Sequence, residues 1–289
     1  MSQNIVAIIC DCDGTLCPDT SDAVVRKLGL DSSRFWKQAE SLVESSWDPP
    51  LAYLTQLLRE AARTGRPLTK RMLEDVGQQV VFYPGATDFV QRLASRLNGS
   101  GDYRQAEVTL EWYIVSSGIE ELLRATPAVA KAKDIFGCSF EYDAQGTATG
   151  VKRVVTFTEK TKFVFAINKG ISGEELRKKP YRVNDAMASA DRRVPFEHMV
   201  YLGDGPSDIP CFSMIKALKG HAIGVTAPGD AEFRKPYELA QGYRLTVGPY
   251  TADYRDDTDL MKMLWRIVES IANSIVEKRA QRMRPSPHP

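Results

Sequence analysis

The sequence has no long hydrophobic run, no marked excess of either charge and few cysteines. Its 38 lysines and arginines nearly balance 37 aspartates and glutamates, giving a formal net charge of +1. This balance, without a basic stripe that carries aromatic residues, does not favour a nucleic acid or an anionic membrane as partner. No apolar stretch approaches the roughly 20 residues that span a bilayer. The N-terminal apolar run is too short for a secretory signal and lacks a basic flank, so we expect a cytoplasmic protein.

The cysteines do not suggest a disulfide framework or a zinc site. There are five of them, and an odd number without a secretion signal does not suit a set of paired disulfides. Cys10, Cys12 and Cys17 are close in sequence, but they lack the CxxC spacing of common zinc sites. We expect reduced, mostly buried thiols.

Three apolar runs each end in polar residues that could take part in chemistry. The runs with the residues that follow them are Ile5–Cys10 with Asp11, Trp112–Val115 with Ser116, and Met199–Leu202 with Gly203. Continuous apolar runs that alternate with helical patterns predict an α/β fold, with a Rossmann-like parallel sheet and helices on both faces. Ligand sites in such sheets lie beyond the carboxyl ends of the strands. The three polar ends should therefore converge on one crevice.

Residues 17–83 have a different pattern, with helical periodicity and no strand-like run. The expected helices are Ala23–Leu28, Ser33–Ser45, Pro50–Arg63 and Thr69–Val80. We interpret this block as a small helical domain inserted into a sheet domain made of residues 1–16 and 84–289. Trp36, Trp47, Pro49 and Pro50 are expected in its core, with contact to a ligand as the alternative.

The rest of the chain predicts a hairpin, further strands and two helices. The expected segments are a hairpin from Phe140 to Val155, helix Lys160–Lys169, an irregular polar excursion over Ile171–Pro195, strands Ala222–Thr226 and Tyr243–Val247, an amphipathic helix over Asp259–Arg279 that docks on the sheet, and a disordered basic tail over Arg282–Pro289.

Four aspartates indicate a magnesium site. They are Asp11 and Asp13, in the turn after the first strand, and Asp204 and Asp208, in the turn after Met199–Leu202. Clustered carboxylates repel each other and resist desolvation, so a chain tolerates them where a cation compensates. Mg²⁺ prefers such hard oxygen donors, together with water and substrate phosphate. Helix N-capping explains Asp208 alone equally well, but it does not explain all four.

Two further segments could bind an anion. Ser116-Ser117-Gly118 lies between a strand and a predicted helix, where a hydroxyl and backbone amides can bind phosphate. Lys160 or Lys162 could neutralise a phosphoryl group or balance the aspartates.

The order of these motifs resembles that of the haloacid dehalogenase superfamily, and within it the phosphoserine phosphatase-like branch. The motifs are Asp-x-Asp-Gly-Thr, an apolar run that ends in Ser, a Lys, and Gly-Asp-Gly-x-x-Asp. The position of the helical block is similar to that of type-one cap domains in this superfamily. The resemblance extends from Asp11 to Asp208 and implies a Mg²⁺-dependent phosphatase.

The resemblance also implies roles for individual residues. Asp11 would be the nucleophile that forms an aspartyl phosphate, and Asp13 the general acid and base. Lys160, with Lys162 as the alternative, would neutralise the phosphoryl group, and Ser116, Ser117 and Gly118 would bind its oxygens. Mg²⁺ would be held by the Asp11 carboxylate, the Asp204 carboxylate and the main-chain carbonyl of Asp13. Asp208 would orient a water on the metal, or Lys160, without contacting the substrate.

An acid at Asp13 suits an alkoxide leaving group, because halide departs without a proton. The resemblance therefore implies a small phosphorylated metabolite as substrate and a monomer or homodimer. Gly14 and Ser117 differ from the residues typical of phosphoserine phosphatases, so it does not single out phosphoserine. The alternatives are a phosphotransferase or phosphonate-cleaving relative, and a ligand-binding domain without turnover.

Overall fold

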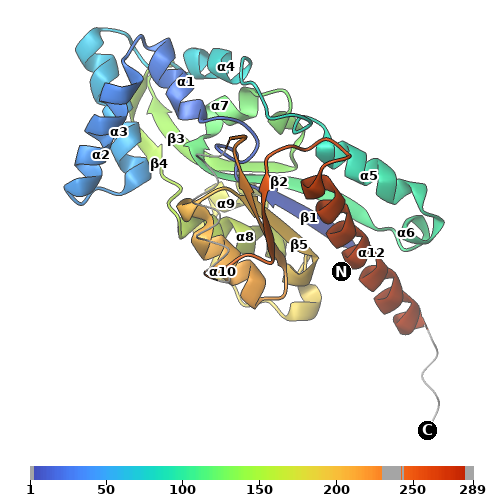
Figure 1. Ribbon diagram of the computed structural model, residues 1–289. Coiled ribbons are helices and arrows are strands. Elements are labelled where there is room, and N and C mark those ends of the chain that lie inside the picture. The colour runs from blue at the N-terminus through green and yellow to red at the C-terminus, as the bar shows by residue number, and fades with distance from the viewer. Residues whose placement is uncertain (1–2, 230–241, 243, 284–289) are drawn as a thin grey trace.

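The computed structural model describes residues 3–229, 242 and 244–283, and its centre is a seven-stranded sheet (Figure 1). The strand order is β4-β3-β2-β1-β5-β6-β7, and every pairing is parallel except that of β3 with β4. The strands are β1 (Ile5–Cys10), β2 (Thr109–Ile119), β3 (Asp134–Tyr142), β4 (Ala148–Arg153), β5 (Met199–Gly203), β6 (His221–Thr226) and β7 (Val247–Thr251). The predicted parallel sheet is confirmed.

The central strand β1 sets the position of the site. All six of its residues are buried, as expected for a strand covered on both faces. It pairs in parallel with β2 and β5, so that Cys10 lies opposite Ile114 on one side and Leu202 on the other. The chain leaves β1 toward β2 and later returns to its other side at β5, which makes this edge a topological switch point. The polar ends of β1, β2 and β5 therefore meet.

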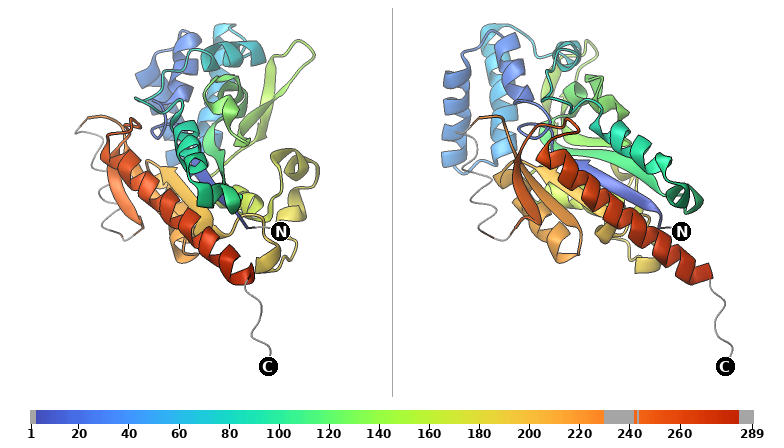
Figure 2. Two further views of the ribbon diagram at one scale, coloured as in Figure 1. Left: turned by 90° about the vertical axis from the view of Figure 1, so that its right-hand side faces the viewer. Right: turned by 45° about the vertical axis from the view of Figure 1, so that its right-hand side comes forward.

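Helices cover both faces of the sheet (Figures 1 and 2). On one face lie α5 (Phe89–Gly99) and α12 (Asp259–Met283), where the Arg96 guanidinium sits 4.1 Å from the centre of the Trp265 ring. On the other face α8 (Glu159–Lys169) packs with α10 (Ile209–Ala217). The shorter helices are α6 (Gly101–Gln105), α7 (Glu120–Ala125) and α9 (Gly173–Lys178). Within the described ranges, no helix is both long and apolar enough to cross a membrane.

Four helices precede the return of the chain to the sheet. They are α1 (Thr20–Lys27), α2 (Ser32–Glu44), α3 (Pro49–Thr64) and α4 (Lys70–Gly77), which confirms the helices expected in residues 17–83. Side chains of Asp19, Asp31, Asp48 and Thr69 cap their N-termini. The Tyr83 amide donates to the Leu16 carbonyl at 2.9 Å, so the two ends of the block lie side by side.

This helical block is not isolated from the sheet. Helix α4 packs on α7, and the segment before α4 bonds to the β3–β4 hairpin, where the Ala148 amide donates to the Leu68 carbonyl at 2.8 Å. The division into two domains stays a prediction, because these contacts join α4 as closely to the sheet as to α1.

Several expected boundaries differ from the structure. Strand β2 continues through Ser116–Gly118, with a register irregularity before Ile119, so these residues are part of a strand end rather than a helix start. The strand predicted over Tyr243–Val247 begins only at Val247, because pairing with β6 starts there; residue 243 lies outside the described residues. The segment 171–195 contains α9 and short 3₁₀ turns, not only irregular chain. Of the predicted tail, residues 284–289 lie outside the described part.

The contact between α4 and α7 can be tested at Gly77. A Cβ atom there would lie 2.2 Å from the carbonyl oxygen of Leu122, whereas one at Gly99, which also ends a helix, would meet nothing within 4 Å. We expect Gly77→Ala to lower the free energy of unfolding by about 1–3 kcal/mol through overpacking. Gly99→Ala should leave it unchanged or raise it by up to about 1 kcal/mol. Urea unfolding followed by circular dichroism measures both, and equal effects would contradict the close approach.

Candidate active site

Asp11 is the first residue beyond β1, and its position is set by strand pairing. Its amide donates to the Leu202 carbonyl at 2.9 Å, which continues the β1–β5 ladder by one residue. Its carboxylate is buried; one oxygen accepts from the Cys12 amide at 2.7 Å and the other from the Lys160 ammonium at 2.7 Å. Burial raises the pKa of Asp11 to about 6 against the opposing charge of Lys160.

Lys160, near the start of α8, is fully buried and lies between two carboxylates. Its ammonium donates to Asp11 and, at 2.8 Å, to Asp208, with the Ser207 hydroxyl at 3.2 Å. Burial opposes the charged form, but the two carboxylates outweigh it and hold the pKa of Lys160 above its usual range. Lys162 points elsewhere and pairs with Glu159 at 2.5 Å. Only Lys160 therefore lies among the aspartates.

Asp208 is fully buried and is bonded by other buried side chains. Besides Lys160, the Tyr201 hydroxyl donates to it at 2.7 Å. Its carboxylate makes no N-cap hydrogen bond to α10, but it accepts from the Gly205 amide at 3.4 Å at the start of the 3₁₀ turn Pro206–Asp208, so it combines a capping contact with its pairing to Lys160. No sequence motif marks Tyr201, and its contact with Asp208 is seen only in this hydrogen bond.

Asp11, Asp204 and Asp208 form a compact group of oxygen donors. One carboxylate oxygen of each lies within 4.8 Å of the others. Burial and the charge of Asp208 raise the pKa of Asp204 to about 8. The raised pKa of Asp204 means that the positive charge of Lys160 does not fully offset the negative charge of these carboxylates. A further cation would therefore stabilise their ionised forms. The donor set is all oxygen, which suits Mg²⁺.

Gly14 allows the turn after β1 to approach this cluster. Its φ is +73°, a left-handed conformation that glycine adopts without strain, and a Cβ atom there would lie 2.2 Å from a carboxylate oxygen of Asp204. The glycine thus brings the turn and Asp204 into direct contact.

Asp13 lies on the same turn as Asp11 in a different environment. One of its oxygens accepts from the Thr20 amide at 2.8 Å, at the start of α1. Burial, then the charge of Asp19, raises the pKa of Asp13 to about 8. A carboxyl group with this raised pKa favours its protonated form at neutral pH.

The cysteines of this turn, Cys12 and Cys17, lie close together. The sulfurs of Cys12 and Cys17 are 3.6 Å apart, and contact with Cys17, together with burial, raises the pKa of Cys12 well above its usual value. All five cysteines are free and buried, which confirms the expected burial; ligand atoms of Cys12, Cys17 and Asp13 lie within 4.8 Å of one another, and the reduced state stays a prediction.

Ser116, Ser117 and Gly118 lie opposite Asp13 at the end of β2. The Ser116 hydroxyl accepts from the Gly118 amide at 2.9 Å, and the Ser117 hydroxyl donates to the Val155 carbonyl at 2.8 Å. A Cβ atom on Gly118 would lie 2.8 Å from an oxygen of Asp13. The missing side chain keeps the space between Ser116 and Asp13 open, whereas the hydroxyl of Ser117 is directed away from it.

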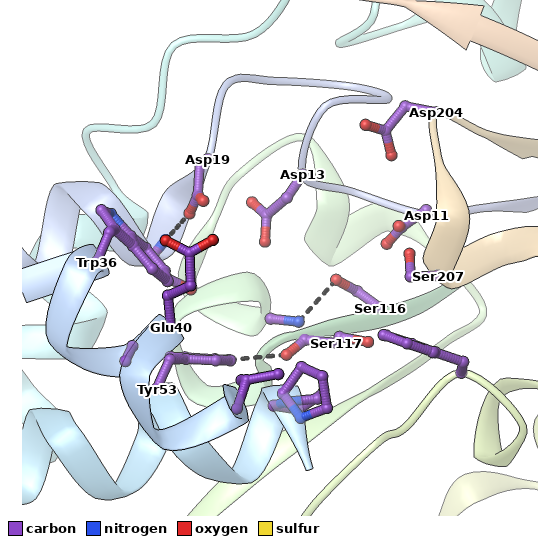
Figure 3. A pocket seen from close by; sticks show the side chains of 17 residues that line it. Asp11, Asp13, Asp19, Trp36, Glu40, Tyr53, Ser116, Ser117, Asp204 and Ser207 are labelled. Atoms are coloured by element: carbon purple, nitrogen blue, oxygen red, sulfur yellow. Dashed lines mark hydrogen bonds between the residues drawn. The ribbon is translucent and has the colours of Figure 1, made fainter. Parts of the chain in front are cut away.

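Asp11, Asp13, Asp204 and residues 116–118 line one cavity of about 530 Å³. Figure 3 shows Asp11, Asp13, Asp204 and Ser116 on one side, with Trp36, Glu40 and Tyr53 opposite them on helices α2 and α3. Pro49 and Pro50 line it as well. Trp36 and both prolines therefore face the cavity, which agrees with the alternative expectation that they contact a ligand. Trp47 instead lies under Arg59, 5.1 Å from its guanidinium.

Sequence reasoning missed Asp19, Glu40, Tyr53 and Ser207 as lining residues. Tyr53 connects the two sides of the cavity, because its hydroxyl donates to the Ser117 carbonyl at 2.7 Å. The spacing of Trp36 and Glu40, four apart on one helix, was the available signal that they share a face.

Comparison with known proteins agrees with this geometry. The sequence matches the haloacid dehalogenase-like hydrolase family over residues 8–213. An uncharacterised protein of Borreliella burgdorferi is 25% identical over 301 aligned residues, which cover 94% of this chain and 99% of that protein.

Two solved structures share the fold at low identity. One is a phospho-aspartyl intermediate analogue of phosphoserine phosphatase (16% identity, TM-score 0.53, 89% of this chain and 96% of that chain). The other is a probable phosphoserine phosphatase from Vibrio cholerae, unliganded form (14%, TM-score 0.54, 95% and 67%). Since the family match covers most of the chain, this protein belongs to the haloacid dehalogenase-like hydrolase family, with a fold like that of phosphoserine phosphatases.

Proposed function

We propose that the protein is a Mg²⁺-dependent phosphatase that hydrolyses a small phosphomonoester through an aspartyl phosphate on Asp11. One observation carries the proposal: a single turn holds Asp11 beside the Lys160 ammonium and Asp13 against the open cavity, where burial raises the pKa of Asp13. A nucleophile has to stay ionised and an acid has to keep its proton, and these two environments favour those opposite states.

The residues present fit a magnesium ion. Asp11 and Asp204 would hold it through carboxylates and Asp13 through its main-chain carbonyl, while Asp208 is already engaged by Lys160 and Tyr201 and would act by orienting Lys160. When bound, Mg²⁺ would offset the charge of the cluster and polarise a phosphoryl oxygen.

The reaction then follows from the placement of the side chains. Asp11 attacks phosphorus, the P–O ester bond breaks, and Asp13 gives its proton to the departing alkoxide. Asp13, now ionised, takes a proton from a water that attacks phosphorus, and the Asp11–phosphorus bond breaks to release inorganic phosphate. Lys160 neutralises the phosphoryl oxygens, and the Ser116 hydroxyl and the amide at Ser117 bind them, whereas the Gly118 amide already donates to Ser116.

We also propose that residues 17–83 act as the cap of this enzyme. Helices α2 and α3 supply the wall of the cavity that faces the reacting aspartates, and the Tyr53–Ser117 hydrogen bond joins this wall to the phosphate side. The leaving group of a phosphate held at Asp11 would lie against this wall.

Replacing the nucleophile tests the first step. We expect Asp11→Asn to lower phosphate release from any ester by about a thousandfold or more, because a neutral amide cannot attack phosphorus. Inorganic phosphate released from a panel of phosphate esters measures the loss, with unchanged circular dichroism as the folding check and Asp102→Asn, on an exposed position of α6, as the control. Undiminished release from Asp11→Asn would refute the assignment. Release from no ester by the unaltered protein would favour the phosphotransferase or phosphonate alternatives.

The pKa of Asp13 predicts an alkaline limit. Because its pKa is raised to about 8, the acid form is present below that pH and is lost as the pH rises through it. We expect the rate of phosphoenzyme formation from an alkyl phosphate to fall about tenfold per pH unit above pH 8. Rapid-quench trapping of the phosphoenzyme measures this rate. With p-nitrophenyl phosphate, whose leaving group needs little protonation, the fall should be weaker, and identical profiles for both esters would contradict the role.

Removing metal tests the aspartate cluster. We expect EDTA to stop phosphate release and added Mg²⁺ to restore it, because without the ion the Asp11 carboxylate would meet an incoming phosphate with no added positive charge beyond that of Lys160. The assay is turnover before chelation, after it and after readdition of metal. Full activity of a thoroughly chelated sample would rule out a required ion.

A further inference from the structure

The part of the cavity beyond the reacting aspartates has a distinctive composition. Helix α2 contributes Trp36, Glu40 and Val43, α3 contributes Tyr53, and Phe157 approaches from the loop before α8. Val43 and Phe157 are among the few large apolar side chains that stay more than one-third exposed. The wall that would meet a leaving group is therefore apolar and aromatic, and the exposed Glu40 adds a carboxylate to it.

Its aromatic rings are held in place by their polar atoms. The Trp36 indole N–H donates to Asp22 at 3.1 Å, and the Tyr53 hydroxyl donates to the Ser117 carbonyl at 2.7 Å. The two ring centres are 5.9 Å apart. Since both polar groups are engaged, the rings offer carbon surface to a ligand, and aromatic faces attract cations.

The charge of the wall has one sign. Glu40 and Asp19 line the cavity outside the aspartate cluster, and no lysine, arginine or histidine lines it in the described part of the chain. The Glu40 carboxylate has no ion pair or hydrogen bond with any described residue, and Figure 3 shows it between Trp36 and Asp13, facing the cavity. A ligand that brought a positive charge here would pair with a carboxylate that is otherwise unpaired.

We propose that the leaving group is an alcohol that carries a cationic ammonium group and no carboxylate, so that the substrate is the phosphate ester of an amino alcohol. This inference rests on the proposed phosphatase activity. The ammonium group sits by Glu40 and Asp19 against Trp36 and Tyr53, while its phosphate reaches Asp11. A substrate carboxylate in the same position would face two carboxylates with no described cation to receive it, which disfavours phosphoserine.

The test compares esters that differ only in charge. Phosphocholine and 3,3-dimethylbutyl phosphate have the same shape, the first cationic and the second neutral at the head group. We expect kcat/KM to be about tenfold or more higher for phosphocholine, as a cation–π contact with a paired carboxylate would give. Phosphoethanolamine should likewise exceed phosphoserine, which adds only a carboxylate.

Glu40→Gln identifies the residue responsible. We expect it to lower the ratio of the two kcat/KM values about fivefold or more, and Glu44→Gln, the same change at the exposed end of α2 and outside the cavity, to leave the ratio unaltered. Equal turnover of both isosteres by the unaltered protein, or the same ratio in Glu40→Gln, overturns the inference but leaves the phosphatase intact. Phosphate release from no ester at all overturns the phosphatase itself and this inference with it.

Discussion

The ion cluster of Lys160 with Asp11 and Asp208 is the constraint on which the site depends. The Lys160 ammonium and the Asp208 carboxylate are fully buried, and the Asp11 carboxylate is nearly so. Leaving any one of these charges without its partners costs several kcal/mol, because a desolvated ion in the interior has no water to replace them. The cluster therefore ties the turn after β1, the start of α8 and the turn after β5 to one another.

This cluster also explains why the neighbouring aspartates differ. Lys160 pairs with Asp11 and Asp208, whereas burial, and after it the charge of Asp208, raises the pKa of Asp204 to about 8. A divalent cation would complete the charge balance at that position. Asp13, only two residues from Asp11, is not among the hydrogen-bond partners of Lys160 and instead accepts from the amide of Thr20 on α1. One turn thus carries two carboxylates whose environments differ in charge and in partner.

The chemistry and the selectivity that we propose come from different parts of the chain. The sheet edge supplies the reacting aspartates, whereas α2 and α3 supply Trp36, Glu40 and Tyr53 on the opposite wall. The hydrogen bond from Tyr53 to the Ser117 carbonyl sets the spacing between the two walls. Residues on α2 can therefore change which alcohol is accepted without displacing the nucleophile.

The sequence by itself determined the parallel sheet, the helices of residues 17–83 and the aspartates that meet at one edge, because continuous apolar runs and helical periodicity report burial directly. It could not decide whether Lys160 or Lys162 lies in the site, because the two are only two residues apart. The packing of α8 directs Lys160 into the aspartate cluster and Lys162 toward Glu159. It also gave no reason to place Glu40 near Asp13, because an exposed glutamate on a helix resembles any solvated residue until a second element faces it. Tertiary structure alone decided which charges were buried together, because strand register and helix packing bring segments about 150 residues apart within hydrogen-bond distance.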